Sequence, residues 1–438
     1  MTTKITNDNL VDSAKVVRGD TAPSSPSEGD LWYDTTAESL KFYQGSAEAF
    51  VKVSAAIAAL TSVSGNLYAG AASTLTLTGE NFLTDNLIVN FTQTSDSIDV
   101  DVSVTPASDT SATVTVPSSV YSNVTSGNAV SITVTNSDNT TSSAQNKTAL
   151  APPSGGTVST SGSYRIHTFT SSGSFVNTIS SLDTQYLVIA GGGGGGGEGA
   201  TYGGGGGGAG GYRNSVPGES SGGPSSAETP LSLATGTYPV TVGAGGNRGD
   251  LNNGSIGGNS VFSTITATGG GGGQSGTAST WPTSDGGSGG GVGGTRDAQS
   301  YGTGISGQGN PGGGNTGSGT GGGGGGAGQA GFDDCASNPV TAGTKHHGDG
   351  GDGLSSSITG SPVFRGGGGG GGDRGGQGPT TYGLGGTGGG ATGASDENGT
   401  NATTATANTG GGGGGASSDD LNSSAGASGV VIIRYQLS

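Results

Sequence analysis

The sequence predicts a mostly β protein with almost no α-helix, dominated by a glycine-rich C-terminal region. Short runs of β-branched and aromatic residues, separated by turn residues, recur through residues 1–190. Most of the 100 glycines come later, in uninterrupted runs such as 191–197 and 366–372. This later region begins and ends on apolar runs, 186–190 and 430–435. Conventional strands are therefore expected at both of its ends, with glycine segments between them.

Composition excludes several classes of protein. The net charge is −17 and there are only 14 Lys and Arg residues, which argues against a nucleic acid partner. The single Cys335 rules out an internal disulfide bond. No stretch of about 18 apolar residues exists, so we expect no membrane insertion. The polar start of the chain lacks the apolar core of a signal peptide, so we expect synthesis in a cytoplasm.

Residues 1–53 predict a small β module. Aromatic and β-branched residues alternate with polar turns in three segments, as in a β-meander. So short a unit has too little core to stand alone. Two roles therefore stay open for its aromatic residues: contacts with a partner, or the module's own core. These residues are Trp32, Tyr33, Phe42 and Tyr43.

The module also carries a recognisable pattern. Pro23 and Pro26 precede the segment Asp-Leu-Trp-Tyr-Asp at 30–34. This pattern resembles a short module found near the N-termini of bacteriophage fibre and other virion proteins. The resemblance implies attachment to other virion proteins through residues 1–53.

Residues 54–150 predict a β-sandwich that contains five strand-like runs. Thr and Val alternate in several of them, the period of a half-buried sheet. The runs are 73–77, 87–91, 98–104, 112–116 and 129–135. The sequence Leu-Thr-Leu-Thr-Gly-Glu-Asn-Phe at 75–82, followed by Val-rich segments, resembles the immunoglobulin-like IPT/TIG domains. That resemblance implies an immunoglobulin-like spacer.

Residues 151–163 are expected to form a linker, and residues 164–438 a glycine-rich domain. Its apolar runs are the only material for a conventional core. The expected strands are 164–170, 174–179, 185–190, 238–242, 260–268 and 430–435. The first and last of them are predicted to pair and form one β base, from which the glycine runs leave and to which they return.

The glycine runs need a stabilising partner, because glycine loses the most conformational entropy on ordering. In the polyproline-II conformation the chain has three residues per turn and makes no internal hydrogen bonds. Its backbone groups then point outward, and runs without side chains can pack side by side through backbone hydrogen bonds. A flexible glycine linker is the alternative. Similar run lengths and irregular intervening segments favour a bundle of polyglycine-II helices.

The flanks of the runs strengthen this interpretation. The segments that carry the resemblance below are 168–175, 186–195, 206–213, 238–246, 353–363 and 426–435. Over about residues 160–438 the chain resembles the glycine-rich domain of phage tail-fibre proteins. The resemblance implies stacked polyglycine-II helices that display variable loops for host recognition.

No catalytic or cofactor site is predicted. Residues 186–197 imitate a dinucleotide-binding turn, but no helix can begin in the glycine run 203–208 that follows. His346 and His347, beside Asp349 and Asp352, fit an exposed loop better than a metal site. The segments 333–335 and 419–420 are read as polar turns, since neither has the neighbours of a nucleophile or calcium site.

The segments between the glycine runs carry nearly all the bulky and charged residues of this domain. These segments are 212–229, 274–311, 332–363, 373–384, 395–408 and 417–425. Aromatic side chains suit sugars and apolar protein patches. Candidate receptor-binding residues are therefore Trp281, Tyr301, Phe332 and Tyr382, although the same residues would also suit capping of the bundle ends.

The sequence therefore predicts a non-catalytic phage fibre or tip protein, assembled in the host cytoplasm and carried on the virion. Its expected partners are other virion proteins and a host surface polysaccharide or outer-membrane protein. A homo-oligomer is expected, with a trimer as the first hypothesis. The alternatives are a structural virion protein, such as a capsid decoration or head fibre, and an ice- or surface-binding protein.

Overall fold

The computed structural model describes most of the chain, and the protein is mostly β. Within the described residues α1 (Ser118–Tyr121) is the only helix, and none is long and apolar enough to cross a membrane. The chain forms two compact units, Met1–Ala151 and Pro152–Leu437. The described residues are 16–27, 30–35, 39–44, 49–52, 57–82, 86–137, 139–199, 202–277, 284–294, 300–314, 319–334, 348–374, 382–396, 399–418 and 421–437.

The first unit begins with a four-stranded sheet. Its strands are β1 (Val16–Gly19), β2 (Leu31–Asp34), β3 (Ser39–Gln44) and β4 (Ala49–Lys52), in that spatial order. β1 pairs parallel to β2 and was not among the strands expected from the sequence. Its four residues are too few to show a period.

Trp32 is a core residue of this small sheet. Its side chain is only 6% exposed, and its indole Nε1 donates to the Gly19 carbonyl at 3.2 Å. The Lys41 ammonium lies 4.8 Å from the centroid of the ring and forms an ion pair with Asp34 at 2.7 Å. Tyr33, Phe42 and Tyr43 are half-buried. Those three, rather than Trp32, keep aromatic surface for a partner.

A β-sandwich completes the first unit. One sheet has the order β10-β7-β5 and the other β6-β12-β11-β8-β9, and both contribute to one apolar core. All five predicted runs are strands, while β5, β6 and β12 were missed. β5 and β12 are largely polar and half-exposed, and β6 has two residues. The strands are β5 (Ala59–Ser64), β6 (Leu67–Tyr68), β7 (Thr74–Glu80), β8 (Leu87–Gln93), β9 (Ile98–Val104), β10 (Ser111–Thr115), β11 (Ala129–Asn136) and β12 (Gln145–Leu150).

The second unit is built on a six-stranded sheet with β26 (Val430–Gln436) near its centre. The order is β13-β14-β26-β16-β17, and β20 also pairs with β16. β26 is a continuous apolar run because apolar clusters cover both faces of the sheet. Its pairing with β14, from Tyr164↔Gln436 to Phe169↔Val431, confirms that the first and last predicted strands form one base. The other strands are β13 (Thr157–Ser161), β14 (Tyr164–Phe169), β16 (Leu182–Ile189), β17 (Tyr212–Asn214) and β20 (Leu231–Leu233).

A second sheet packs against this base, with the order β15-β21-β22-β23. Residues 260–268, expected as one strand, form a hairpin instead. Ser263 has a φ of 53°, which reverses the chain and buries Phe262 and Ile265 in the same core. The strands are β15 (Gly173–Asn177), β21 (Gly236–Thr241), β22 (Ser260–Phe262) and β23 (Ile265–Ala267).

His167 on β14 is fully buried between the two sheets. Its Nδ1 donates to the Gly155 carbonyl at 2.7 Å, so Nε2 is the acceptor for the Tyr435 hydroxyl at 2.8 Å. Burial, followed by the charge of Arg165, lowers the His167 pKa to about 4, although the bond to Gly155 opposes this. The folded base therefore requires a neutral imidazole.

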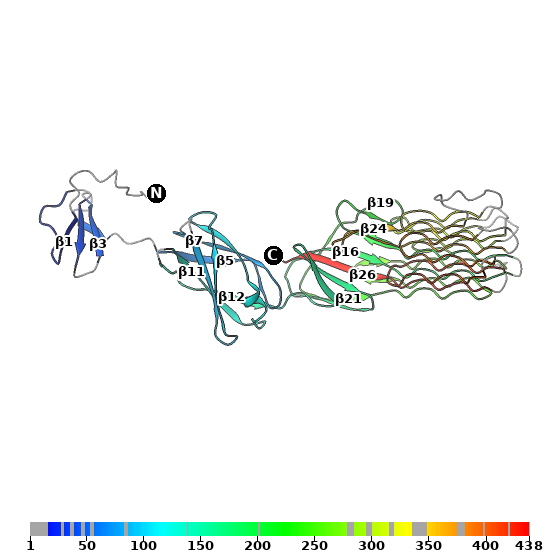
Figure 1. Ribbon diagram of the computed structural model, residues 1–438, viewed down its shortest axis with the longest axis horizontal. Helices are drawn as coiled ribbons and strands as arrows, with labels where there is room; N and C mark the ends of the chain where they lie inside the picture. The colour runs from blue at the N-terminus through cyan, green and yellow to red at the C-terminus, as the bar shows by residue number, and fades with distance from the viewer. Residues whose placement is uncertain are drawn as a thin grey trace. The chain divides into compact units, whose positions relative to one another are not determined.

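Glycine segments run from the base as extended rods, to the right of the strands β16, β21 and β26 in Figure 1. β16 leads directly into the rod 191–197. Gly191, Gly194 and Gly197 donate N–H bonds of 2.9–3.0 Å to one neighbour, the segment 252–258. Gly192 and Gly195 donate to segment 424–427, and Gly193 and Gly196 to segment 205–208. The partner changes with a period of three residues, as polyglycine-II packing requires.

The carbonyls of the same rod face three further neighbours. Gly191, Gly192 and Gly193 accept bonds from Gly270, Gly246 and Gly413, each at 2.8–2.9 Å. Partners of the N–H groups run antiparallel to this rod, because their numbers fall as the rod's numbers rise, and partners of the carbonyls run parallel. The rod therefore bonds to six neighbours: 252–258, 424–427, 205–208, 270–276, 246–249 and 413–416.

The five uninterrupted runs of six or seven glycines occupy the centre of this lattice. We call them the inner rods: 191–197, 203–208, 321–326, 366–372 and 410–415. Within the described residues each bonds to neighbours on all sides. An added Cβ at Gly193, Gly206 or Gly369 would lie 2.0 Å from a neighbouring carbonyl oxygen. These runs are thus packed scaffold and not a flexible linker.

Outer rods tolerate side chains on their exposed side. In the segment 243–249, Gly243, Gly246 and Gly249 are buried while Ala244 and Asn247 are exposed. The segment 400–408 replaces glycine by alanine: Ala405 packs with Ala391 and Ala427 of adjacent rods. A small residue at every third position is therefore enough at the edge of the lattice.

Substitution of an inner-rod glycine tests the lattice. The change Gly369→Ala places a Cβ 2.0 Å from the Gly413 oxygen, so the rods must separate and lose backbone hydrogen bonds. We expect the free energy of unfolding to fall by at least about 3 kcal/mol, measured by denaturant unfolding. Gly236→Ala is the control, since its nearest neighbour would be 3.9 Å away. Equal stability of the two variants would contradict the lattice.

The buried His167 predicts acid sensitivity. Its pKa is about 4 in the folded protein against 6.5 as the ordinary value, so its contribution to stability is present above pH 6.5 and lost as pH falls toward 4. The loss amounts to about 3 kcal/mol at most. Unfolding experiments from pH 7 to 4 should show a smaller pH dependence for His167→Gln than for the unchanged chain. If the stability of both proteins changes equally with pH, His167 is not the source of the acid sensitivity.

Candidate functional site

The end of the rods farthest from the sheets is called here the distal end. Gly203 donates to the Gly319 carbonyl at 3.0 Å, and Gly294 donates to Gly203 at 2.8 Å. Ala416 likewise donates to the Gly196 carbonyl at 2.9 Å. Hydrogen bonds thus bring the ends of rods far apart in sequence to one face of the second unit, visible at the right of Figure 1. Turns that are far apart in the sequence therefore lie together on this face.

Carboxylate and amide side chains replace missing rods along the edge of the lattice. Asp349 Oδ1 accepts the backbone N–H of Leu384 at 2.6 Å, and Asp352 Oδ1 accepts that of Thr387 at 2.8 Å. The spacing of three residues on both segments matches the polyglycine-II turn. Asn253 and Asn259 do the same for Ser275 and Gly269.

These contacts explain the acidic residues that had been considered as metal ligands. Asp349 and Asp352 bind backbone N–H groups, while His346 and His347 lie outside the described residues. Within the described part of the chain no group of three or more His, Cys, Asp or Glu could hold a metal ion. Asp333 accepts the Gly314 N–H at 2.6 Å and is thereby a lattice cap. Cys335 and residues 419–420 also lie outside the described ranges.

The predicted receptor-binding aromatic residues are distributed around the distal end. Tyr301 is 48% exposed, and Phe332 and Tyr382 are half-buried. Tyr301 and Phe332 belong to segments that both border the rod 309–314, while Tyr382 begins a segment farther round the edge. Trp281 lies outside the described residues. The aromatic residues are near the predicted face, but no aromatic ring contact among them is part of the described structure.

Two of the segments expected as distal loops between the glycine runs lie wholly or partly at the base. Residues 212–229 contain β17, β18 (Ser220–Ser221) and β19 (Ser225–Ser226), which belong to the base. The later part of the segment 332–363 likewise contains β24 (Leu354–Ser356), paired with β25 (Val363–Arg365). Their placement as distal loops was therefore wrong. The chain passes from base to distal end and back, so every second connection returns to the sheets.

An open cleft of about 320 Å³ lies at one corner of the distal end. Three segments line it: Glu198 ends an inner rod, Arg248 to Leu251 form the turn between two outer rods, and Leu421 begins the last rod. Asp250 and Asn422 complete the lining. Arg248 Nε is 3.2 Å from Asp250 Oδ1, and both side chains are well exposed. None of the predicted aromatic residues takes part.

Hydrogen bonds to the backbone fix the walls of this cleft. Gly249 donates to the Gly195 carbonyl at 2.9 Å, and the Ser423 hydroxyl donates to the Gly249 carbonyl at 2.5 Å. Asn422 donates its N–H to Asn401 Oδ1 at 2.8 Å. The side chains of the cleft therefore project from a backbone that the lattice holds in place.

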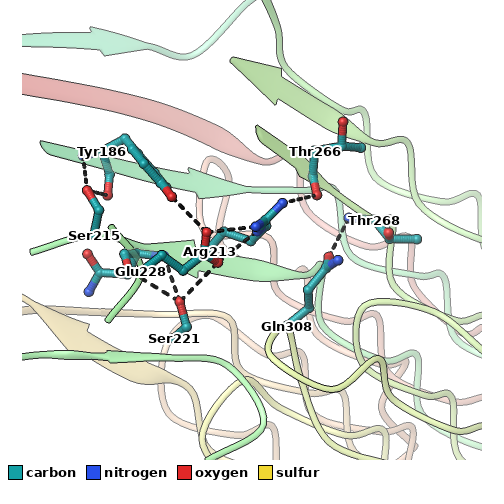
Figure 2. Close-up of polar contacts among 9 residues, drawn as sticks. Tyr186, Arg213, Ser215, Ser221, Glu228, Thr266, Thr268 and Gln308 are labelled. Carbon is teal, nitrogen blue, oxygen red and sulfur yellow. Dashed lines mark hydrogen bonds and ion pairs between the residues drawn. The ribbon is translucent and has the colours of Figure 1, made fainter. Parts of the chain in front are cut away.

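A second polar cluster lies at the base and is shown in Figure 2. Glu228 accepts bonds from the Tyr186 hydroxyl and from Arg213 Nε and Nη2, each at 2.7 Å. The Ser221 hydroxyl donates to the same carboxylate at 3.4 Å. Arg213 Nη1 donates to the Thr266 carbonyl at 3.3 Å, which ties β17 to β23.

The electrostatics of this cluster are those of a structural junction. Burial, together with the Glu228 carboxylate, raises the pKa of Tyr186. Hydrogen bonding to Glu228 raises the pKa of Arg213. Tyr186 is 1% exposed, and Glu228 uses both oxygens in protein contacts. These charged groups therefore have a structural role: they join β16, β17 and the segment that contains Glu228.

Comparison with known families agrees with this architecture. A family model for a glycine-rich domain matches residues 169–436. The chain belongs to this glycine-rich domain family. The matched residues begin at the end of β14 and finish at the end of β26, so the match covers the rods and nearly all of their base. No curated protein matches the chain.

The junction at Glu228 gives a stability prediction. Glu228→Gln removes the charge opposite the partly buried Arg213, so we expect the free energy of unfolding to fall by roughly 2–3 kcal/mol. Chemical denaturation measures the change. Asp183→Asn is the control, because Asp183 is an exposed carboxylate on the same strand as Tyr186. If Glu228→Gln lowers the free energy of unfolding no more than Asp183→Asn does, Glu228 has no structural role at this junction.

Proposed function

We propose that this protein is a non-catalytic adhesin of a bacteriophage fibre or tail tip, which recognises the host cell surface through its distal end. The observation that carries the proposal is the separation of roles along the glycine-rich unit. The inner rods consist of glycine, whereas bulky and charged side chains such as Arg248, Leu251, Tyr301 and Tyr382 lie at the ends and edges. A rigid scaffold reduces the ordering cost of binding, which suits a recognition surface.

The remaining parts have supporting roles in this proposal. Residues 1–53 attach the protein to other virion proteins, with Tyr33, Phe42 and Tyr43 as the available aromatic surface. The sandwich is an IPT/TIG-like spacer. The assembled protein is a homotrimer on the virion, and its receptor is a surface polysaccharide or an outer-membrane protein. These roles rest on the resemblance to phage fibre proteins and on membership of the glycine-rich domain family.

Cell binding tests the proposal directly. The labelled full-length chain should bind saturably to cells of the strain that the parent particle infects, and an excess should block adsorption of that particle. An unrelated acidic protein at the same concentration is the control. The bound surface should remain chemically unchanged, because recognition is non-catalytic. Absence of both binding and blocking would refute the adhesin role.

Immunogold electron microscopy separates this role from its alternative. We expect gold particles at the tail fibre or tail tip. Labelling restricted to the capsid would instead establish a structural virion protein, such as a decoration protein or head fibre.

A further inference from the structure

The cleft at the corner of the distal end has the size and lining of a small-molecule site. Its volume of about 320 Å³ falls at the lower end of the range for ligand pockets. Polar groups of different kinds converge there: the carboxylates of Glu198 and Asp250, the guanidinium of Arg248 and the amide of Asn422. Leu251 and Leu421 add aliphatic surface. We propose that this cleft binds a single pyranose sugar without an anionic group.

The mixture of groups selects the ligand class. A pyranose ring presents C–H groups on its faces and hydroxyls around its rim. Leu251, whose side chain is 64% exposed, offers an aliphatic contact for a ring face. Carboxylates accept two hydrogen bonds or more each, and an amide both donates and accepts, so together they suit neighbouring hydroxyls. An apolar ligand would offer these groups no hydrogen bonds.

Charge narrows the class further. Two carboxylates and one guanidinium line the cleft, and the whole chain carries a charge of −17. Anionic sugars and phosphates are therefore repelled, whereas neutral and amino sugars are accepted. The Arg248–Asp250 pair is well exposed and contributes little to stability. A ligand hydroxyl can replace that contact at small cost.

The position of the cleft supports binding to a larger glycan. Glu198, the Arg248 to Leu251 turn and Leu421 come from three different rods, and the lattice holds all three backbones. Asp250 is 77% exposed in its side chain, so the rim is open to solvent. A sugar unit in the middle of a polysaccharide can therefore enter the cleft from solvent while its neighbouring units stay outside. This inference rests on the proposed function, because it identifies the receptor chemistry at the same distal end.

Saturation-transfer NMR with the full-length chain tests the site. The probes are galactose, mannose, N-acetylglucosamine and glucosamine, with glucuronic acid as the anionic comparison. At least one neutral or amino sugar should give a signal with a Kd of about 1–10 mM, as expected for a small ligand with few contacts. Glucuronic acid should give none.

Matched variants locate the binding. Leu251→Asp and Asn422→Asp should each lower the affinity for the sugar that gives a signal by roughly tenfold or more. Ile256→Asp is the control, because Ile256 is 63% exposed on the same pair of rods but does not line the cleft. Thermal melting of all three variants should match that of the unchanged chain, since these side chains are exposed.

Three results would overturn the inference: no response to any neutral or amino sugar, a response unchanged by both cleft variants, or a thermal shift with calcium alone. Cell binding separates this outcome from failure of the adhesin role. If the chain and its Leu251→Asp variant bind cells equally well, the adhesin role stands and the sugar cleft is wrong. If a sugar binds the cleft but no cells are bound, the cleft stands and the adhesin role is wrong.

Discussion

The backbone hydrogen bond between neighbouring rods is the interaction on which the second unit depends. Its geometry places carbonyl oxygens where a side chain would otherwise begin, 2.0 Å from an added Cβ at Gly193. Glycine is thus required by packing, and the unfavourable entropy of ordering it is offset by backbone bonds on every side of each inner rod. The sheets complement this arrangement. They supply the apolar core that the rods lack, and β16 and β26 lead straight into the lattice at its two chain ends.

Much of this architecture could be predicted from glycine runs and apolar runs. The inner rods were recognisable because uninterrupted glycine has few ordered alternatives, and β14 and β26 because their apolar residues had no other core. The outer rods were not recognised. Segments 243–249 and 400–408 interrupt their small residues with Asn, Arg and Thr, so their sequences resemble ordinary loops. The pairing of rods was also unpredictable, because glycine backbones carry no side-chain information about their partners.

The candidate site shows a similar division. Tyr301 and Tyr382 could be selected by residue type alone, since aromatic residues stand out among glycines. The cleft could not, because Glu198, Asp250 and Leu421 are ordinary residues that only the lattice brings together. Asp349 and Asp352 illustrate a different limit. From the sequence they were expected in an exposed loop, but in the fold Asp349 is buried and both carboxylates accept backbone N–H groups where no rod is present.

The side chains on the outer rods have a consequence for solubility. A hexagonal array of identical glycine rods has no natural boundary, and each exposed rod would offer unpaired backbone groups to the next molecule, as an open sheet edge does. Exposed residues such as Asn247 and Ile256 prevent another rod from approaching, and caps such as Asp349 occupy the N–H groups that would receive it. The outer side chains thus limit the lattice to one molecule. Without them, the same backbone hydrogen bonds would join rods of different molecules and fibres would grow.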